Sequence, residues 1–217
     1  MKISINTVNV LKNFAKINPS IVIPEGNTLK TISPSKTIMA KAVVDTEFPK
    51  RFAIYNLDRF ISVLSLFNDP DLSFDENSVK IRGNGKTTQY VYAEESTITK
   101  APDKNLDLPS IDASFTLRYE NLKDVEKASS VLGLPEIAVV GEGGKIYLQA
   151  IDSKNPSGDV YSVEIGEGNK SFTAIFKSEN IKIITDDYKV SICSLGISHF
   201  VGSHAEYWIA VEQNSSF

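Results

Sequence analysis

The fold is indicated first by residues 52–67, FAIYNLDRFISVLSLF, because this stretch joins a short β-strand to an amphipathic helix and recurs in altered form. Asn56 is a predicted N-cap, and the apolar residues after it share one helical face. FAIY at 52–55 corresponds to TAIF at 173–176. Each is followed by a predicted helix, at 57–67 or 179–184, and then by an aromatic strand. The sequence therefore predicts an internal duplication with a period of roughly 110–120 residues.

Each half also begins with a predicted amphipathic helix. In residues 5–17, INTVNVLKNFAKI, the expected inward face holds Val8, Leu11, Phe14 and Ala15, and the expected outward face holds Asn9, Lys12, Asn13 and Lys16. In residues 115–132 the expected inward residues are Leu122, Val125, Ala128 and Leu132.

Short β-type segments separated by turn residues fill the rest of both halves. They are predicted at 21–23, 28–32, 37–44, 52–55, 72–74, 78–82 and 87–93, and then at 137–140, 145–151, 160–165, 171–176, 189–194, 197–201 and 206–212. Residues 94–112 break this pattern with prolines and mixed charge, which is typical of a linker. The predicted fold is α+β, with domains at 1–95 and 113–217, a linker at 96–112, and two helices packed on antiparallel sheet in each domain.

Composition favours a soluble intracellular protein. Of 217 residues 41% are hydrophobic, Cys193 is the only cysteine, and no apolar run approaches the roughly 20 residues that span a membrane. The N-terminal segment lacks the continuous apolar stretch of a signal peptide. The net charge of −4 argues weakly against a simple nucleic-acid-binding module. However, residues 1–24 contain Lys2, Lys12 and Lys16 and no acid, so the first helix is locally basic.

Motifs for catalysis, metals or cofactors are not found. Residues 83–87, GNGKT, superficially suggest a phosphate loop, but they join two predicted strands and are interpreted as a hairpin turn. His199 and His204 are the only histidines, and with one cysteine they supply neither a familiar zinc-ligand set nor a nucleophile-and-base pair. We therefore expect no enzymatic activity, no metal and no cofactor.

The predicted architecture suggests a ring. A sheet with helices on one face leaves edge strands free, and edges of identical copies pair readily. Head-to-tail pairing closes into a ring when the rotation allows it. Lys12 and Lys16 on an inner helical layer would then meet a polyanion through contacts that carry no sequence information.

Three stretches resemble the sliding clamps of T-even-type bacteriophages: residues 10–18, VLKNFAKIN; residues 53–57, AIYNL, with 64–66, LSL; and residues 204–207, HAEY. The resemblance extends from end to end in element order and linker position. It implies a homotrimeric ring around double-stranded DNA that is loaded by an ATP-driven clamp loader and bound by the phage DNA polymerase in the cytoplasm of the infected host. It also implies support of late transcription.

The resemblance further implies functional residues. Lys12, Lys16 and Lys127 match positions expected to face DNA, and Lys2 and Lys123 are added as neighbouring candidates. Glu120, Asp124 and Glu126 dilute the charge of the third helix. By analogy, a pocket for partner peptides is expected beside the linker and the last strands, at Leu106, Leu108, Ile111, Trp208 and Val211. For Trp208 a role as a core anchor remains the alternative.

Two other classes of protein stay open from the residues alone. A β-rich structural or assembly protein of a virion would share the strands and the oligomerisation, but it gives no reason for a duplicated helical layer with lysines. A hydrolase using scattered carboxylates would lack a nucleophile motif. Solution mass and a turnover screen separate these alternatives.

Overall fold

The chain divides into two compact units, Met1–Asp103 and Lys104–Phe217, in a computed structural model that describes residues 1–104 and 106–217. Asn105, within the predicted linker, lies outside the described residues. The boundary falls inside the predicted linker, and the finer division into 1–95, 96–112 and 113–217 stays a prediction. Within the described ranges, no helix is long and apolar enough to cross a membrane.

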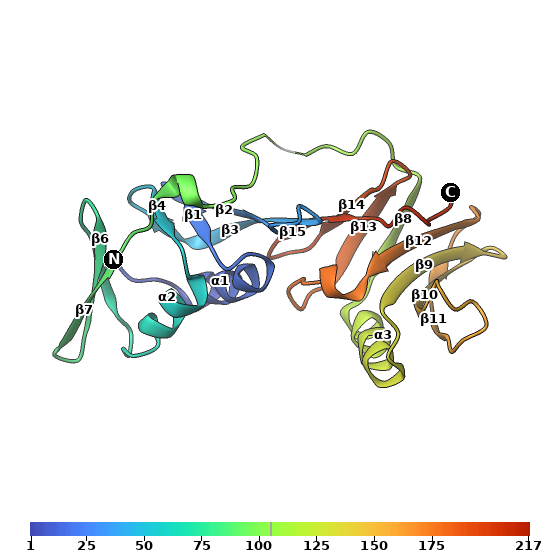
Figure 1. Cartoon of the computed structure of the whole chain (residues 1–217), viewed down its shortest axis with the longest axis horizontal. Coiled ribbons are helices and arrows are strands. Elements are labelled where there is room, and N and C mark those ends of the chain that lie inside the picture. The colour runs from blue at the N-terminus through green and yellow to red at the C-terminus, as the bar shows by residue number, and fades with distance from the viewer. Residues whose placement is uncertain (105) are drawn as a thin grey trace. The chain divides into compact units, whose positions relative to one another are not determined.

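Unit 1 consists of two helices and seven strands (Figure 1). In chain order these are α1 (Ile5–Ile17), β1 (Ile21–Ile23), β2 (Gly26–Ile32), β3 (Ile38–Phe48), β4 (Phe52–Ile54), α2 (Leu57–Leu64), β5 (Asp71–Phe74), β6 (Ser78–Gly83) and β7 (Lys86–Val91), followed by a 3-10 turn at Glu95–Thr97. Antiparallel pairs join β1 to β4, β2 to β3, and β5 to β6 to β7. Both predicted helices and all predicted strands of this half are present.

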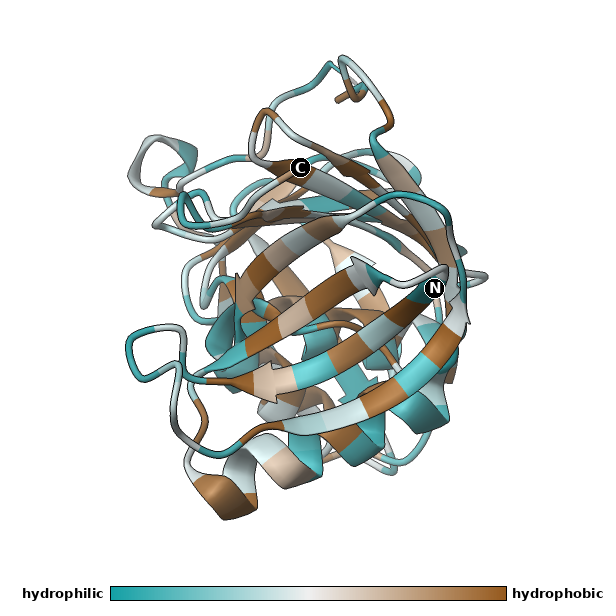
Figure 2. Cartoon of the chain, turned by 90° about the vertical axis from the view of Figure 1, so that its right-hand side faces the viewer, coloured by the Kyte–Doolittle hydropathy of each residue, from teal (hydrophilic) through white to brown (hydrophobic). Residues whose placement is uncertain are grey.

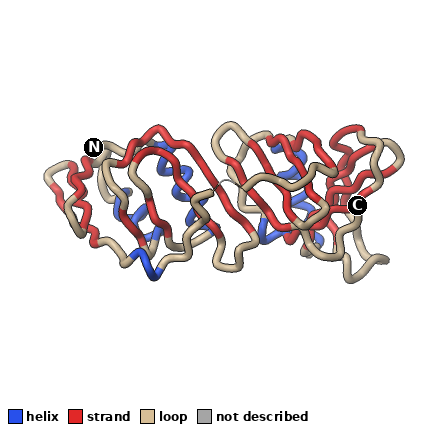
Figure 3. The backbone as a smooth tube through the Cα atoms, turned by 90° about the horizontal axis from the view of Figure 1, so that it is seen from above, coloured by secondary structure: helices blue, strands red, loops and turns tan. Residues whose placement is uncertain are grey.

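Helices and strands of unit 1 meet in one apolar core. Leu11 and Phe14 of α1 and Phe60 of α2 are fully buried. The helix α1 contacts β2, β3 and α2, and Figure 3 shows the helices in blue on one face of the strands in red. Asn56 caps α2 as predicted, since its side chain accepts a hydrogen bond from the Arg59 N–H at 2.8 Å.

The glycine-rich segment at 83–87 is a hairpin turn, as predicted. It joins β6 to β7 in antiparallel register, and Asn84 and Gly85 have φ values of 50° and 72°. Two consecutive residues with positive φ are typical of a type I′ turn, which suits the twist of a two-stranded hairpin. The segment opens no helix, so it has no phosphate-loop geometry.

The described residues of unit 2 form one α-helix and eight strands. They are β8 (Ala113–Leu117), α3 (Tyr119–Leu132), β9 (Glu136–Glu142), β10 (Lys145–Ile151), β11 (Tyr161–Glu167), β12 (Phe172–Lys177), a 3-10 turn at Ser178–Asn180, β13 (Tyr188–Cys193), β14 (Ile197–Val201) and β15 (Glu206–Ala210). One antiparallel sheet has the order β11-β10-β9-β12, and a second antiparallel array runs β8-β13-β14-β15. Figure 2 shows hydrophobic and hydrophilic residues alternating along several of these strands.

The helix predicted at 179–184 is wrong. Only Ser178–Asn180 form a single 3-10 turn, and the chain then runs on without regular structure. The segment reads ENIKII, and β-branched isoleucines lose side-chain freedom in a helix. Asn180 and Ile181 are buried. The segment therefore contributes side chains to the core although its backbone forms no helix. Unit 2 therefore carries one α-helix where two were predicted.

Two smaller predictions also need correction. Asn13, predicted on the outward face of α1, is buried, because α1 packs against both β3 and α2. Leu132 was placed inward, but it is 43% exposed. The helix α3 ends there at Gly133, whose φ is 68°, and Leu134 turns into the core instead.

Candidate nucleic-acid interface and partner pocket

The exposed side of α1 is a narrow basic stripe. The helix begins at the N-cap Ser4, whose hydroxyl accepts a hydrogen bond from the Thr7 N–H at 3.0 Å. Asn9, Lys12 and Lys16 are exposed on the side opposite the core. The helix contains no acidic residue, and among residues 1–104 and 106–217 neither lysine has an ion-pair partner. Both ammonium groups are therefore available to an external anion.

The corresponding helix of unit 2 has a different charge. Lys123 and Lys127 of α3 are exposed, but Glu120, Asp124 and Glu126 are exposed beside them. Partial desolvation by the surrounding protein raises the pKa of Glu126 above its ordinary value. Two cations against three carboxylates give this face no net positive charge, so α3 attracts a polyanion less than α1 does.

Lys2 is paired within the unit. It precedes α1, and its ammonium forms an ion pair with the Asp69 carboxylate. The hydrogen bond to Asp69 raises the pKa of Lys2. Both side chains are exposed, so a strong external anion could replace Asp69 at small cost. Among the described residues, Lys2 is the one of the five predicted DNA-facing lysines that forms a direct ion pair.

The predicted partner pocket is brought together in part. The Trp208 indole N–H donates a hydrogen bond to the Leu106 carbonyl at 2.9 Å, and its ring stacks on His199 with centroids 4.4 Å apart. Trp208 and Val211 are buried, Leu106 and Leu108 are half-buried, and Ile111 is 61% exposed. Trp208 is thus a core anchor that fastens the linker, and Ile111 offers the most accessible apolar surface of the five.

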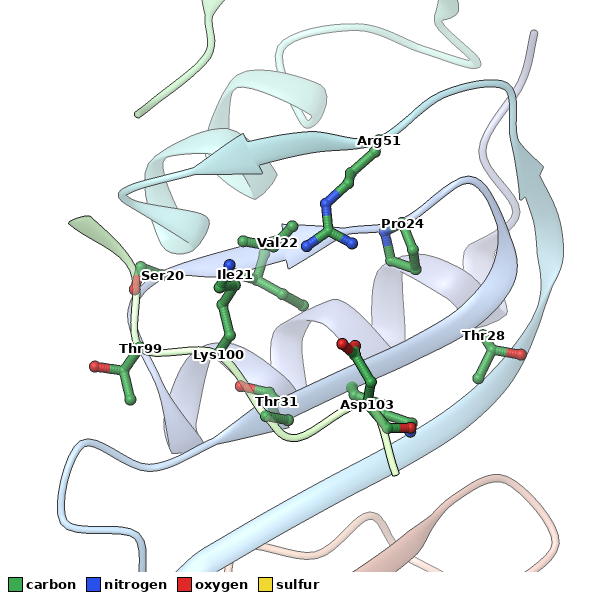
Figure 4. Close-up of a pocket in the computed structure, with 12 residues that line it drawn as sticks. Ser20, Ile21, Val22, Pro24, Thr28, Thr31, Arg51, Thr99, Lys100 and Asp103 are labelled. Carbon is green, nitrogen blue, oxygen red and sulfur yellow. The ribbon is translucent and has the colours of Figure 1, made fainter. Parts of the chain in front are cut away.

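Unit 1 contains a cavity that no local sequence pattern predicts. It has a volume of about 180 Å³ and lies between β1, β2 and residues 99–103 (Figure 4). Lys30 holds these residues over β2, since its ammonium donates to the carbonyls of Pro102 and Asp103 at 3.4 and 2.7 Å. Contacts between residues more than 70 positions apart create this cavity.

Unit 2 also gathers a serine, a histidine and an aspartate. The Ser203 hydroxyl donates to Asp186 Oδ2 at 2.7 Å and lies 2.8 Å from His204 Nδ1. In a hydrolytic triad the imidazole stands between the other two, with a different ring nitrogen toward each. Here His204 Nδ1 also faces Asp186 Oδ2, at 3.3 Å. Asp186 therefore closes the turn at 202–204 and does not orient a base toward a nucleophile.

Comparisons with known proteins cover nearly the whole chain. A family model described as DNA polymerase processivity factor matches residues 4–102, and one described as gp45 sliding clamp, C terminal, matches residues 114–213. The sliding clamp of Vibrio phage KVP40 is 39% identical over an alignment of 219 positions, which covers 98% of this chain and 99% of that protein. The sliding clamp of Escherichia phage RB69 is 30% identical over an alignment of 226 positions, which covers 100% of this chain and 99% of that protein.

Solved structures share the fold at low sequence identity. The structure titled "C-terminal region of FEN-1 bound to A. fulgidus PCNA" is similar with a TM-score of 0.70 at 13% identity, over 96% of each chain. This likeness concerns the fold alone, and it agrees with the duplicated order of helix and strands in the two units. Because the two family models together span residues 4–213 with only a short gap and the phage relatives match from end to end, the chain belongs to the sliding clamps of T4-like bacteriophages and is a DNA polymerase processivity factor.

Proposed function

We propose that three copies of this clamp close into a ring around double-stranded DNA, with Lys12 and Lys16 of α1 facing the phosphates. The observation that carries this proposal is the exposed, acid-free lysine stripe on α1. Contacts between lysine and phosphate supply affinity without sequence readout. A ring held by such contacts can move along the duplex while staying attached to it.

Ring closure would use strands that are edges of their sheets. In unit 1 β7 is an outer strand of β5-β6-β7, and in unit 2 β11 is an outer strand of β11-β10-β9-β12. Apolar side chains are exposed along or beside both, including Val91 at 66% and Val160 at 53%. Pairing β7 of one copy with β11 of the next is head-to-tail, so three copies can close without leaving either edge free.

Lys127, Lys123 and Lys2 are proposed as weaker DNA contacts. Acids flank the first two on α3, and Asp69 pairs with Lys2. Their contribution should therefore grow only when those carboxylates are removed or displaced. The stripe on α1 supplies most of the attraction in this account.

Partner proteins are proposed to dock beside the linker in unit 2. Leu106, Leu108 and Ile111 would supply an apolar surface, and Trp208 and Val211 would hold its floor. The DNA polymerase and an ATP-driven clamp loader are the expected partners, and late transcription factors are a further one. The site of action is the cytoplasm of the infected host, and the role is mechanical and non-enzymatic.

The experiment compares circular and linear DNA. The solution mass is first measured by light scattering, and a trimer is expected. The clamp is then loaded onto nicked circular DNA, and its retention is measured before and after the circle is cut. Enclosure predicts stable retention on circles and rapid loss from linear ends.

A monomer, or retention that ignores free ends, would contradict enclosure. With such a result the alternative of a β-rich virion assembly protein would return, because that protein needs no topological link to DNA. Blocking both ends of the linear DNA with bulky proteins is the control. Under enclosure, blocked ends restore retention.

A further inference from the structure

We propose that the cavity of unit 1 beneath residues 99–103 is a binding site for a small oxyanion of the phosphate class. The proposal does not depend on the ring or on DNA, so either can fail while the other stands. It concerns a site that lies wholly within Met1–Asp103.

The cavity is large enough for such a ligand. Its volume of about 180 Å³ far exceeds the roughly 10–15 Å³ that one water requires. The floor is formed by Ile21 and Thr31, which are buried. Figure 4 shows Arg51 entering from the segment before β4 and Lys100 entering from residues 99–103.

Three cations line the cavity, and each retains donors. The Arg51 guanidinium binds Glu95 through Nε at 2.9 Å and Nη2 at 2.5 Å, which uses two of its five N–H donors. Lys100 donates to Glu95 at 2.8 Å, which uses one of three. Lys30 approaches from β2. A planar guanidinium beside an ammonium is a common arrangement for recognising phosphate.

The Thr31 hydroxyl lies beneath the floor, out of reach of a ligand in the cavity. Thr31 is 3% exposed, and its Oγ1 is buried and has no hydrogen-bond partner among the described residues. Recognition therefore falls to the cationic side chains. An oxyanion in the cavity accepts the remaining N–H groups of Arg51 and Lys100 at once.

Asp103 acts as a counter-charge at the rim. Its carboxylate is exposed and lines the cavity with Arg51. Together Glu95 and Asp103 balance two of the three cations, which leaves about one positive charge for a ligand. An entering anion must displace Asp103 into solvent, so removal of this carboxylate should tighten binding.

The test is a titration with inorganic phosphate at constant ionic strength, balanced with chloride. Chemical shifts of backbone amides are followed by NMR in the whole chain. Saturable changes are expected around residues 28–31 and 99–103. Sulfate should produce the same pattern, because the site recognises tetrahedral oxyanions.

Variants of opposite sign make the test sharp. Arg51→Ala should weaken phosphate binding at least about tenfold, since it removes a charge-assisted hydrogen bond. Asp103→Asn should tighten binding several-fold, because it removes the counter-charge at the rim. Arg82→Ala is the matched control, because Arg82 is exposed on β6 and lies outside the cavity.

Equal affinities for Arg51→Ala and Arg82→Ala would overturn the proposal, as would shifts that chloride reproduces. If Arg51→Ala does not fold, Lys100→Met provides the same comparison without breaking the contact between Arg51 and Glu95. If neither Asp103→Asn nor Lys100→Met changes the affinity for phosphate, the cavity holds water only.

Discussion

The two units share an order of elements but differ in the layer of helices. Unit 1 presents α1 and α2, and the outward stripe of α1 has lysines and no acid. Unit 2 presents α3 alone, with three carboxylates among its exposed lysines. The duplication therefore kept the scaffold and allowed the charge to diverge. In this protein the attraction to DNA is predicted to be concentrated in unit 1.

The largest expected difference in stability comes from the cores beneath these helices. Phe14→Ala in α1 should lower the free energy of unfolding by about 3–5 kcal/mol, because the ring is fully buried between helix and sheet. Leu122→Ala in α3 should cost less, near the lower end of about 2–5 kcal/mol. Urea unfolding measures both, with Asn9→Ala as an exposed control. A larger loss for Leu122→Ala would break the comparison.

The linker is fastened differently in the two units. Trp208→Phe removes the indole N–H that donates to the part-buried Leu106 carbonyl, and it should cost about 1–3 kcal/mol. Lys30→Met in unit 1 releases two exposed carbonyls and should change stability by no more than about 0.5 kcal/mol. Hydrogen exchange of linker amides separates the two. Equal protection in both variants would contradict this difference.

A carboxylate of unit 1 should stabilise the fold at neutral pH. Hydrogen bonds from Arg51 and Lys100 lower the pKa of Glu95 to about 2, from an ordinary value of 4.5. The charged form is therefore favoured by folding, and its contribution is lost as the pH falls from about 4.5 toward 2. Since Glu95 is partly exposed, Glu95→Gln should cost about 0.5–1 kcal/mol at pH 7. A cost that persists at pH 2 would contradict the ion-pair explanation.

Replacing a carboxylate of unit 2 should have the opposite effect on stability at pH 7, and this effect should be the smallest of those predicted. Partial desolvation raises the pKa of the exposed Glu126, so the folded protein holds a proton there more readily than the unfolded chain does. Stability then decreases as the pH rises through that pKa. Glu126→Gln should stabilise the protein at pH 7 by up to about 0.5 kcal/mol, with no gain in acid. Thermal unfolding of both variants across pH tests the pair together.

Much of the scaffold could be predicted because local patterns determine it. The spacing of Leu11 and Phe14 predicts α1, and Asn84-Gly85 predicts the turn between β6 and β7. The prediction of a helix at 179–184 is wrong, because apolar spacing alone does not show that the isoleucines there pack from an irregular backbone. The strand β3 continues to Phe48, beyond the predicted end at 44. Its last residues alternate between exposed acids and buried Thr46 and Phe48, which is the period-two pattern of a half-buried strand.

The candidate sites depended on contacts that no local pattern reveals. Lys12 and Lys16 could be proposed because one helix face is visible in sequence. The pairing of Lys2 with Asp69 and the bond between Trp208 and Leu106 join residues 67 and 102 positions apart. The cavity beneath residues 99–103 likewise arises from long-range packing. Amphipathic spacing predicts which residues share one face of a helix. Only the folded structure shows which residues from elsewhere in the chain contact that face.

The most direct test of the account reverses the charge of each helix in turn. Lys12→Glu with Lys16→Glu is compared with Lys123→Glu with Lys127→Glu, and the number of nucleotides synthesised per loading event is measured with polymerase and loader present. Light scattering first confirms that each variant keeps the wild-type mass. The account predicts a loss on the order of tenfold for the pair on α1 at moderate salt and a clearly smaller loss for the pair on α3. Unchanged synthesis by an intact oligomer of the α1 variant, or a greater loss from α3, would contradict it.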